Sequence, residues 1–345
     1  MKRIKNLYQQ ICEFENIERA YYLARRGKRY RAEVLRYTIN KQMNILKLRR
    51  EFMEERYRQG PYKAFYIREP KLRLISALPF YDRVAQHAIN NVLEPILDNK
   101  FYFHSYACRK NKGMHKASEQ LGKWIYEQTY PGRPLYAIKG DIHHFFASID
   151  HEILKRLLRR VFADAPLLHL LDRIIDSGGE NGRGVPVGNL TSQLFANFYL
   201  NELDKFVKEQ LHAKFYIRYM DDFVILSHDK AELDGYLTEI EKFINSKLRL
   251  DFNPKTCVLN CKNNVNFVGY RTWADHKKLR KSSVRNMRLK IRLFRHGKIS
   301  KVRLLKAYTS WDGHASHADA WALRQKIQEE VIEAINQMET GQKKK

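Results

Sequence analysis

The stretch Tyr219-Met220-Asp221-Asp222 constrains this chain more than any other feature of its sequence. It stands between two β-prone apolar runs, residues 215–219 and 223–227, which predicts a hairpin with adjacent carboxylates at its tip. Two neighbouring carboxylates repel each other and resist burial, so such a tip is suited to holding a cation. Magnesium prefers carboxylate oxygens and shares the phosphates of a substrate. The stretch therefore predicts half of a phosphoryl-transfer site.

The charge of the chain indicates what it binds. Sixty-four lysines and arginines stand against 38 acidic residues, which leaves a net charge of +26. A solubilising surface needs only a few net charges. An excess of this size predicts a polyanionic partner, namely nucleic acid.

Targeting features and cysteine content indicate the cellular compartment. The basic N-terminus is not followed by an apolar run, and no stretch is apolar enough to span a bilayer, so we expect neither a secretory signal nor a membrane partner. Cys257 and Cys261 lack a second Cys/His pair nearby, which argues against a zinc site. The scattered cysteines favour reduced thiols in a cytoplasmic protein.

Periodicity predicts an α+β catalytic lobe between two basic helical ends. The expected elements are basic helices over 1–60, a strand at 71–75, a helix over 82–97, a strand over 135–142, a Gly-rich loop at 177–184, a helix from about Ser192, the hairpin, a helix over 233–248, short strands at 248–253 and 265–271, and basic helix from Lys277. A site with two metal ions needs a third carboxylate from another strand. Asp141 ends the apolar strand 135–142 and is placed for that role, although an Asp there is also typical of a helix N-cap.

Taken in order, these blocks resemble a reverse transcriptase from about residue 60 to 320. The matching blocks are Lys71-x-Arg73-x-Ile75, Asp82-Arg83-Val-Ala-Gln-His-Ala-Ile, Asp141 with Phe145-Phe146, Gly184-Val-Pro-Val-Gly-Asn-Leu-Thr-Ser-Gln193, Tyr219-Met-Asp-Asp222, Leu250-x3-Pro254-Lys255 and Phe267-Val-Gly269-Tyr270. The resemblance implies an α+β right-hand polymerase with fingers, a palm containing an antiparallel sheet, and a helical thumb. We expect fingers over 1–135, a palm over 136–273 with a finger-palm connection near 178–186, a thumb over 274–340, and a disordered basic tail over 341–345.

The resemblance also implies site residues and cofactors. Asp141 and Asp221 would ligate two Mg²⁺ ions, which Mn²⁺ could replace, with the backbone carbonyl of Ile142 joining them and Asp222 as a weaker ligand. The residues expected at the nucleotide are Lys71, Arg73, His144, Phe145, Phe146, Val187, Gly188, Gln193 and Lys255, the last as a proton donor to pyrophosphate. The expected primer grip is Phe267, Gly269 and Tyr270, and the expected duplex contacts are Arg285, Arg288, Arg292 and Arg295.

Several of these residues also have a purely structural interpretation. Lys71 and Arg73 could form a solvated strand face, and Phe146 could be a core residue instead of the side chain that rejects a ribose 2′-hydroxyl. The basic thumb helix over 285–303 could be a generic charged face, although a duplex explains the sign of its charge better. His314 and His317 are expected to pack or to contact RNA backbone and not to form a metal pair.

One position indicates a subtype. Group II intron and retroviral enzymes usually carry Pro-Gln-Gly where this chain has Pro186-Val187-Gly188, and a branched apolar side chain cannot replace the amide's hydrogen bond. Together with 105–109, 276–283 and 310–318, the run 187–193 resembles reverse transcriptases of diversity-generating retroelements. That resemblance implies error-prone cDNA synthesis at template adenines, with Val187 as the main determinant; a conservative packing change is the alternative.

The implied partners are template RNA, the RNA/cDNA duplex, deoxynucleoside triphosphates, and a small basic oligomeric accessory protein, in a bacterial or phage-infected cytoplasm. We expect no RNase H or endonuclease domain after the thumb. Two alternatives are a related bacterial reverse transcriptase used in phage defence and a maturase-like RNA chaperone. Neighbouring genes would distinguish a phage-defence enzyme from a retroelement enzyme. The intact carboxylates argue against the maturase-like chaperone.

Overall fold

The computed structural model describes residues 3–67, 73–130 and 132–342. These residues form two compact units that alternate along the chain. The first unit contains residues 1–110, 141–212 and 236–255, and the second contains 111–140, 213–235 and 256–345. The predicted palm, 136–273, therefore contributes segments to both units.

The first unit is mainly helical. Its helices are α1 (Tyr8–Cys12), α2 (Phe14–Ala24), α3 (Ala32–Ile39), α4 (Lys41–Met53), α5 (Phe80–Asp98), α7 (Phe145–Ser148), α8 (His151–Val161), α9 (Ala165–Asp176) and α10 (Leu190–Lys205) with a π-helical end, Phe206–Gln210. The basic helices over 1–60 and the helix over 82–97 are confirmed. Helix α5 buries Val84, Ala88 and Leu93 and packs against α2 and α10. The Asp164 carboxylate caps α9 and also accepts from the backbone N–H groups of Leu7 and Tyr8, at 2.6 and 2.9 Å, so it fixes the N-terminal segment.

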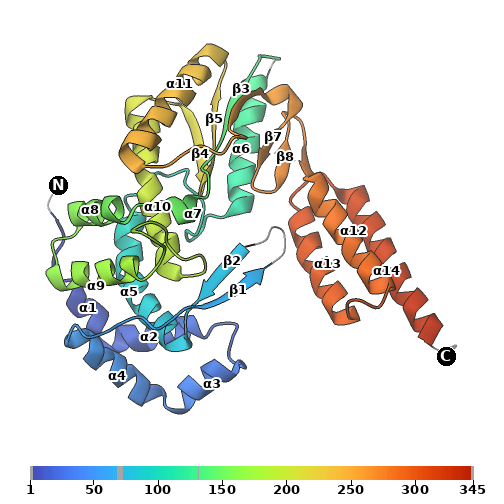
Figure 1. Cartoon of the computed structure of the whole chain (residues 1–345). Helices are drawn as coiled ribbons and strands as arrows, with labels where there is room; N and C mark the ends of the chain where they lie inside the picture. The colour runs from blue at the N-terminus through green and yellow to red at the C-terminus, as the bar shows by residue number, and fades with distance from the viewer. Residues whose placement is uncertain (1–2, 68–72, 131, 343–345) are drawn as a thin grey trace. The chain divides into compact units, whose positions relative to one another are not determined.

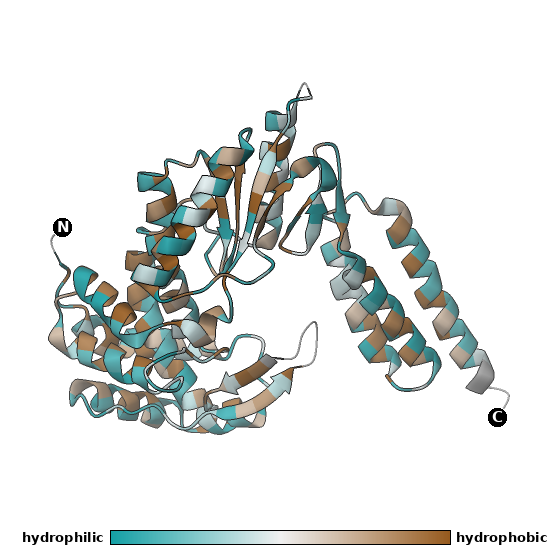
Figure 2. Ribbon diagram, turned by 45° about the horizontal axis from the view of Figure 1, so that its top comes forward, coloured by the Kyte–Doolittle hydropathy of each residue, from teal (hydrophilic) through white to brown (hydrophobic). Residues whose placement is uncertain are grey.

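A two-stranded antiparallel hairpin completes the first unit. Strand β1 (Lys63–Ile67) pairs with β2 (Arg73–Ala77), and the pairing runs from Lys63↔Ala77 to Ile67↔Arg73. Both strands carry apolar side chains, visible as brown segments in Figure 2, although every residue of β1 is exposed. Lys71 lies outside the described residues. A hairpin with this exposed apolar surface is a candidate contact for another molecule.

The second unit is built on a four-stranded sheet with the order β4–β5–β3–β6. The strands are β4 (Phe215–Tyr219), β5 (Asp222–Ser227), β3 (Tyr136–Asp141) and β6 (Cys257–Asn260). Strands β4 and β5 form the predicted hairpin, with Tyr219 opposite Asp222, and β3 pairs with β6 in antiparallel register. Helix α6 (Met114–Thr129) contacts β4. The predicted hairpin and the predicted strand that ends at Asp141 are both confirmed.

A small sheet and a helical bundle form the rest of the second unit. The sheet contains β7 (Val265–Phe267), β8 (Tyr270–Thr272) and β9 (Lys277–Leu279). Figure 1 shows α12 (Lys281–Arg295), α13 (Lys301–Ala315) and α14 (Trp321–Gln342) side by side, and each of the three contacts the other two. Helix α11 (Lys230–Phe243), with its π-helical end Ile244–Leu248, has residues in both units. Among the described helices, none is both long and apolar enough to cross a bilayer.

Four of the predicted elements were wrong. The basic helix expected from Lys277 begins only at Lys281, because residues 277–279 pair with β8 as strand β9. Residues 248–253 contain only an isolated bridge at Phe252, and the strand lies further on, at β6. The alternation of Leu250 and Phe252 is typical of a strand, but Pro254 cannot donate to a ladder. Residues 265–271 form two strands, because Val268 and Gly269 have positive φ and turn the chain. The basic segment 285–303 is two helices, which separate at Gly297 with φ 68°.

Candidate functional site

The β4–β5 hairpin tip presents Asp221 and Asp222, both partly exposed. Met220 turns the chain with a positive φ of 56°. The guanidinium of Arg218, which is fully buried, donates to the Met220 carbonyl at 3.0 Å. This charge-assisted hydrogen bond from a buried cation supports the turn that carries the two carboxylates. Sequence reasoning missed Arg218; the only indication was a cation within an apolar run.

Asp222 has a second cationic neighbour. Lys139 on β3 forms an ion pair with the Asp222 carboxylate, and the two side chains are 17% and 22% exposed. Partial burial strengthens such a pair relative to one in open solvent. Because an ammonium group already neutralises Asp222, this carboxylate is less available to a metal ion. Sequence reasoning missed Lys139 as well, since nothing local links it to a residue on another strand.

The ends of two neighbouring strands lie against each other here. A Cβ atom built on Gly140 would be 2.1 to 2.6 Å from three ring atoms of Phe223. Only glycine therefore fits at this position of β3 while the buried Phe223 ring keeps its place. Gly140 immediately precedes Asp141, and Phe223 immediately follows Asp222. The C-terminal end of β3 is thus beside the N-terminal end of β5.

In the first unit, the backbone after Asp141 is fixed by a short antiparallel bridge. The Asn253 N–H donates to the Asp141 carbonyl at 2.8 Å, and the His143 N–H donates to the Asp251 carbonyl at 2.9 Å. In this pattern the carbonyl of Ile142, the residue between them, points away from the bridge partner. The orientation suits its predicted role as an oxygen ligand.

The next residues begin α7. His144 is left-handed, with φ 44° and ψ 39°, and serves as the N-terminal flanking residue of the helix. Histidine is among the few non-glycine residues enriched in this conformation. Phe145 is 2% exposed and belongs to the core, whereas Phe146 is half-buried. Of the two rings, only Phe146 is therefore open to a second molecule.

Several of the residues predicted to bind the nucleotide come together in the first unit. The Val185 N–H donates to the Phe146 carbonyl at 2.8 Å, and the Ser76 N–H on β2 donates to the Val187 carbonyl at 3.0 Å. Gly188 has φ 117°, and a Cβ there would be 3.1 Å from the Ile75 side chain. Backbone hydrogen bonds thus connect the segment around Val187 both to the turn carrying Phe146 and to strand β2, which begins at Arg73.

A buried amide network holds the start of α10, which carries the half-buried Gln193. Gln86 is 2% exposed; its side-chain oxygen accepts from the Leu190 N–H at 3.1 Å, and its side-chain nitrogen donates to Gln59 at 3.0 Å. The Asn189 amide donates to the Tyr62 hydroxyl at 3.0 Å. These contacts satisfy a helix-terminal N–H that would otherwise lack a partner. Gln86 lies in the block recognised in the sequence, but its role was not predicted.

The predicted primer-grip residues belong to the β7–β8 hairpin. Phe267 and Tyr270 are buried, and the Tyr270 hydroxyl lies 2.9 Å from both Nδ1 and the carbonyl of His314. A Cβ on Gly269 would be 3.2 Å from the His314 ring. His314 is therefore a packing residue, one of the two roles expected for it.

The remaining predicted residues lie at the surface. Lys255 is exposed, and its backbone N–H donates to the Asn253 side chain at 3.1 Å. Two of the predicted duplex arginines join helices α12 and α14: Arg288 contacts both carboxylate oxygens of Glu330 at 3.0 to 3.3 Å, and Arg295 lies 3.3 Å from Glu333. Arg285 and Arg292, also predicted duplex contacts, are exposed on the same helix, α12.

The donor set can be compared with the needs of magnesium. Asp141, Asp221 and the Ile142 carbonyl are hard oxygen ligands, which suit Mg²⁺. Within residues 3–67, 73–130 and 132–342, no three His, Cys, Asp or Glu side chains are grouped to hold a metal. Asp222 is paired with Lys139. A magnesium ion held by the predicted ligands would therefore need further oxygen ligands, which substrate phosphates can supply. In donor chemistry, these predicted ligands suit Mg²⁺.

Comparisons with known proteins identify the family. Residues 66–272 match the family described as reverse transcriptase (RNA-dependent DNA polymerase). Protein YkfC of Escherichia coli K12 is 30% identical over 172 residues, which cover 47% of this chain and 45% of YkfC. The group II intron-encoded protein LtrA of Lactococcus lactis is 29% identical over 173 residues, which cover 47% of this chain and 28% of LtrA. A telomerase structure from Candida albicans with a fragment of telomeric RNA aligns with a TM-score of 0.49 at 13% identity, covering 82% of this chain and 56% of that one.

Because the family match spans more than half of the chain, the protein belongs to the reverse transcriptase family, whose members are nucleotidyltransferases. The predicted α+β polymerase fold with an antiparallel sheet is confirmed. The aligned segments span less than half of YkfC and less than a third of LtrA.

Proposed function

We propose that this chain is an RNA-directed DNA polymerase that uses Asp141 and Asp221 to hold two Mg²⁺ ions. The observation that supports this most strongly is the contact between Gly140 and Phe223. Gly140 precedes Asp141, and Phe223 follows Asp222, the neighbour of Asp221. When bound, the ions supply Lewis-acid activation of a primer 3′-hydroxyl and neutralise charge on the transferred phosphate. The carboxylates contribute by fixing where that charge is neutralised.

The other residues orient the incoming nucleotide in this proposal. Backbone N–H groups after Asp141, at His144 and Phe145, face the triphosphate, and Lys71 and Arg73 provide charge-assisted hydrogen bonds to it. The half-buried Phe146 ring lies against the sugar and rejects a ribose 2′-hydroxyl. The hydrogen bond between Val187 and Ser76 supports a shared pocket, because it connects the sugar-facing segment to the strand of Arg73.

Primer extension tests the proposal. Wild-type protein should extend a DNA primer on an RNA template in Mg²⁺, and in Mn²⁺ as a substitute. Asp221→Asn and Asp141→Asn should each lower the rate by at least about 100-fold, since each removes a charge that the transition state needs. Asp251→Asn, in the segment that forms the isolated bridge to Ile142, is the matched control. Equal rates in wild type and Asp221→Asn would refute the assignment.

We further propose that the enzyme serves a diversity-generating retroelement and makes cDNA with errors at template adenines. The residue that supports this is Val187, which places a branched apolar side chain where an amide is usual. The proposal includes a dedicated template RNA and a small, basic, oligomeric accessory protein in a bacterial or phage-infected cell. Sequencing cDNA from wild type and Val187→Gln should show fewer adenine errors in the variant. An unchanged error spectrum would rule out Val187 as the determinant.

A second candidate is a maturase-like RNA-binding role. It is favoured by the similarity to the group II intron-encoded protein LtrA and, over 115 residues, to nuclear intron maturase 2 of Arabidopsis thaliana at 28% identity. An intron splicing assay separates the two candidates. Splicing assistance that survives Asp221→Asn, with no primer extension by the wild type, would favour the maturase-like role.

A further inference from the structure

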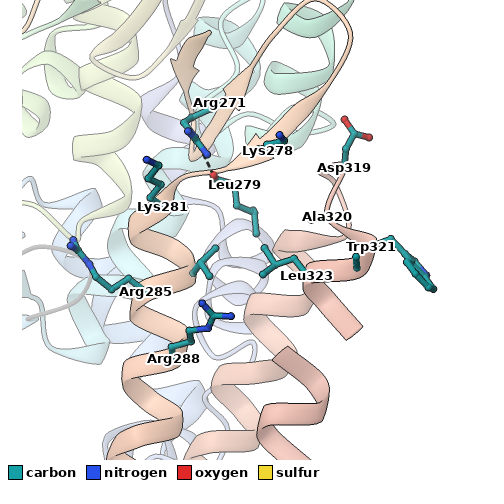
Figure 3. A pocket seen from close by; sticks show the side chains of 12 residues that line it. Arg271, Lys278, Leu279, Lys281, Arg285, Arg288, Asp319, Ala320, Trp321 and Leu323 are labelled. Atoms are coloured by element: carbon teal, nitrogen blue, oxygen red, sulfur yellow. Dashed lines mark hydrogen bonds between the residues drawn. The ribbon is translucent and has the colours of Figure 1, made fainter. Parts of the chain in front are cut away.

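A basic pocket in the second unit belongs to none of the predicted site regions as a whole. It lies between β8, β9, the first half of α12 and the start of α14, and has a volume of about 540 Å³ (Figure 3). Leu279, Val284 and Leu323 contribute apolar side chains to it. Its cationic lining residues are Arg271, Lys278, Lys281, Arg285 and Arg288. An apolar surface with a strongly cationic rim favours an anionic ligand that also has a flat or apolar part.

Two of these cations are available to a ligand. Arg288 is held by Glu330, as described above. Lys281 and Arg285 are exposed, and neither forms an ion pair with any carboxylate in the described part of the chain. Asp319 is the acidic residue of the lining, but its carboxylate accepts from the Lys277 N–H at 2.6 Å and points away from the arginines in Figure 3. The pocket therefore has uncompensated positive charge.

An exposed aromatic residue marks one side of the pocket. Trp321, the first residue of α14, is 73% exposed. In Figure 3 its indole points outward, away from Arg285 and Arg288. Base stacking on aromatic rings, combined with a cationic track for the backbone, is how proteins bind single strands. A duplex, by contrast, offers mainly phosphates and would leave the indole and the apolar lining unused.

We propose that this pocket binds an unpaired segment of RNA. One base lies on Leu279 and Leu323, its phosphates contact Lys281 and Arg285, and the next base stacks on Trp321. The proposal goes beyond polymerase activity, since it concerns RNA that is not paired with a primer. It also differs from the duplex contact predicted for Arg285, because it assigns the surrounding apolar and aromatic residues to a base.

Ala322 offers a clean test, because it lines the pocket, is exposed and lies at the second position of α14. A glutamate there interacts favourably with the helix dipole, so folding is preserved while phosphate is repelled. Affinity is measured by fluorescence anisotropy for a single-stranded RNA of about ten nucleotides, a length within the usual site size. Ala322→Glu should weaken binding by at least about 10-fold. Ala322→Gln, which has the same shape as the Glu variant but no charge, should change binding by less than about 2-fold.

Two further variants test the individual contacts. Trp321→Ala should weaken single-strand binding by roughly 5- to 150-fold, the range expected for loss of one stacked base. Lys281→Gln should reduce the slope of log affinity against log salt by about 0.7, the value for one phosphate contact in a single strand. Lys306→Gln, an exposed lysine on α13 that does not line the pocket, should leave affinity for the single strand unchanged.

Four results would overturn the proposal. Equal weakening by Ala322→Glu and Ala322→Gln would show a steric effect only. Equal weakening of a blunt RNA–DNA duplex would make the pocket part of a duplex grip, and equal displacement by a hexaglutamate peptide would make it a general anion patch. A single-stranded DNA of the same sequence, bound as tightly and with the same sensitivity to the variants, would overturn the choice of RNA. Because binding is measured without nucleotide, failure of primer extension would refute only the polymerase proposal.

Discussion

The contact between Gly140 and Phe223 makes a quantitative prediction. In Gly140→Ala, the new methyl group would be 2.1 Å from the nearest ring atom, and Phe223 is 0% exposed, so the ring has no open space to enter. Overpacking of this kind costs about 1–3 kcal/mol, and the clash is severe enough to place this substitution at the upper end. The ring adjoins Asp222, so the hairpin tip should shift as well. We therefore expect the unfolding free energy to fall by about 3 kcal/mol. The rate of primer extension should fall by more than this loss of stability alone would cause.

Urea unfolding at constant pH gives the first quantity, and primer extension in Mg²⁺ gives the second. Gly235→Ala is the matched control, because Gly235 is helical and nothing lies within 4 Å of the place that its new methyl group would take. That variant should be neutral or more stable by up to about 1 kcal/mol. The double variant Gly140→Ala with Phe223→Leu should recover part of the loss, since the smaller side chain makes room. A cost below about 0.5 kcal/mol for Gly140→Ala would refute the packing described for β3 and β5.

Three further predictions concern charge and hydrogen bonding. Lys139→Gln removes the cation paired with Asp222 and leaves that carboxylate to a metal ion, so the Mg²⁺ concentration for half-maximal primer extension should fall. An unchanged concentration would show that this ion pair does not affect metal binding. Burial and the nearby Lys28 and Arg83 lower the pKa of His87 from 6.5 to about 4. Folding stability from this group should be complete above pH 6.5 and decline as pH falls toward 4, by about 1–2 kcal/mol after allowance for partial exposure, and His87→Gln should flatten that part of the urea-unfolding profile. Tyr270→Phe should cost about 1–3 kcal/mol in the same assay, because the buried hydroxyl contacts His314 and His115; a neutral result would contradict those hydrogen bonds.

Local sequence patterns were sufficient for the elements that carry the proposed carboxylates. The hairpin around Asp221 and the strand ending at Asp141 were predicted because each is an apolar run of strand length with a polar end. The false strand at 248–253 shows the limit of the same method. Alternating Leu250 and Phe252 satisfy a two-residue period, yet the left-handed Arg249 and the following Pro254 prevent a ladder.

The supporting residues could not be predicted, because their roles depend on which strands and helices are neighbours. The pairing of Lys139 with Asp222 follows from the adjacency of β3 and β5, and the chain separates the two residues by 83 positions. The need for glycine at position 140 follows from the same adjacency. Gln86 likewise becomes an anchor only once α5 meets the start of α10. Each is a contact between distant segments, which local periodicity does not encode.

The proposal that Asp141 and Asp221 share metal ions can be tested by anomalous diffraction from crystals of the protein with a primer, an RNA template, a non-reacting nucleotide and Mn²⁺. The account predicts two anomalous peaks about 3.5–4 Å apart, both within coordinating distance of the two carboxylates. Lys139 should remain beside Asp222. Peaks bound to other residues, or a single ion that contacts Asp221 without Asp141, would contradict the proposed site.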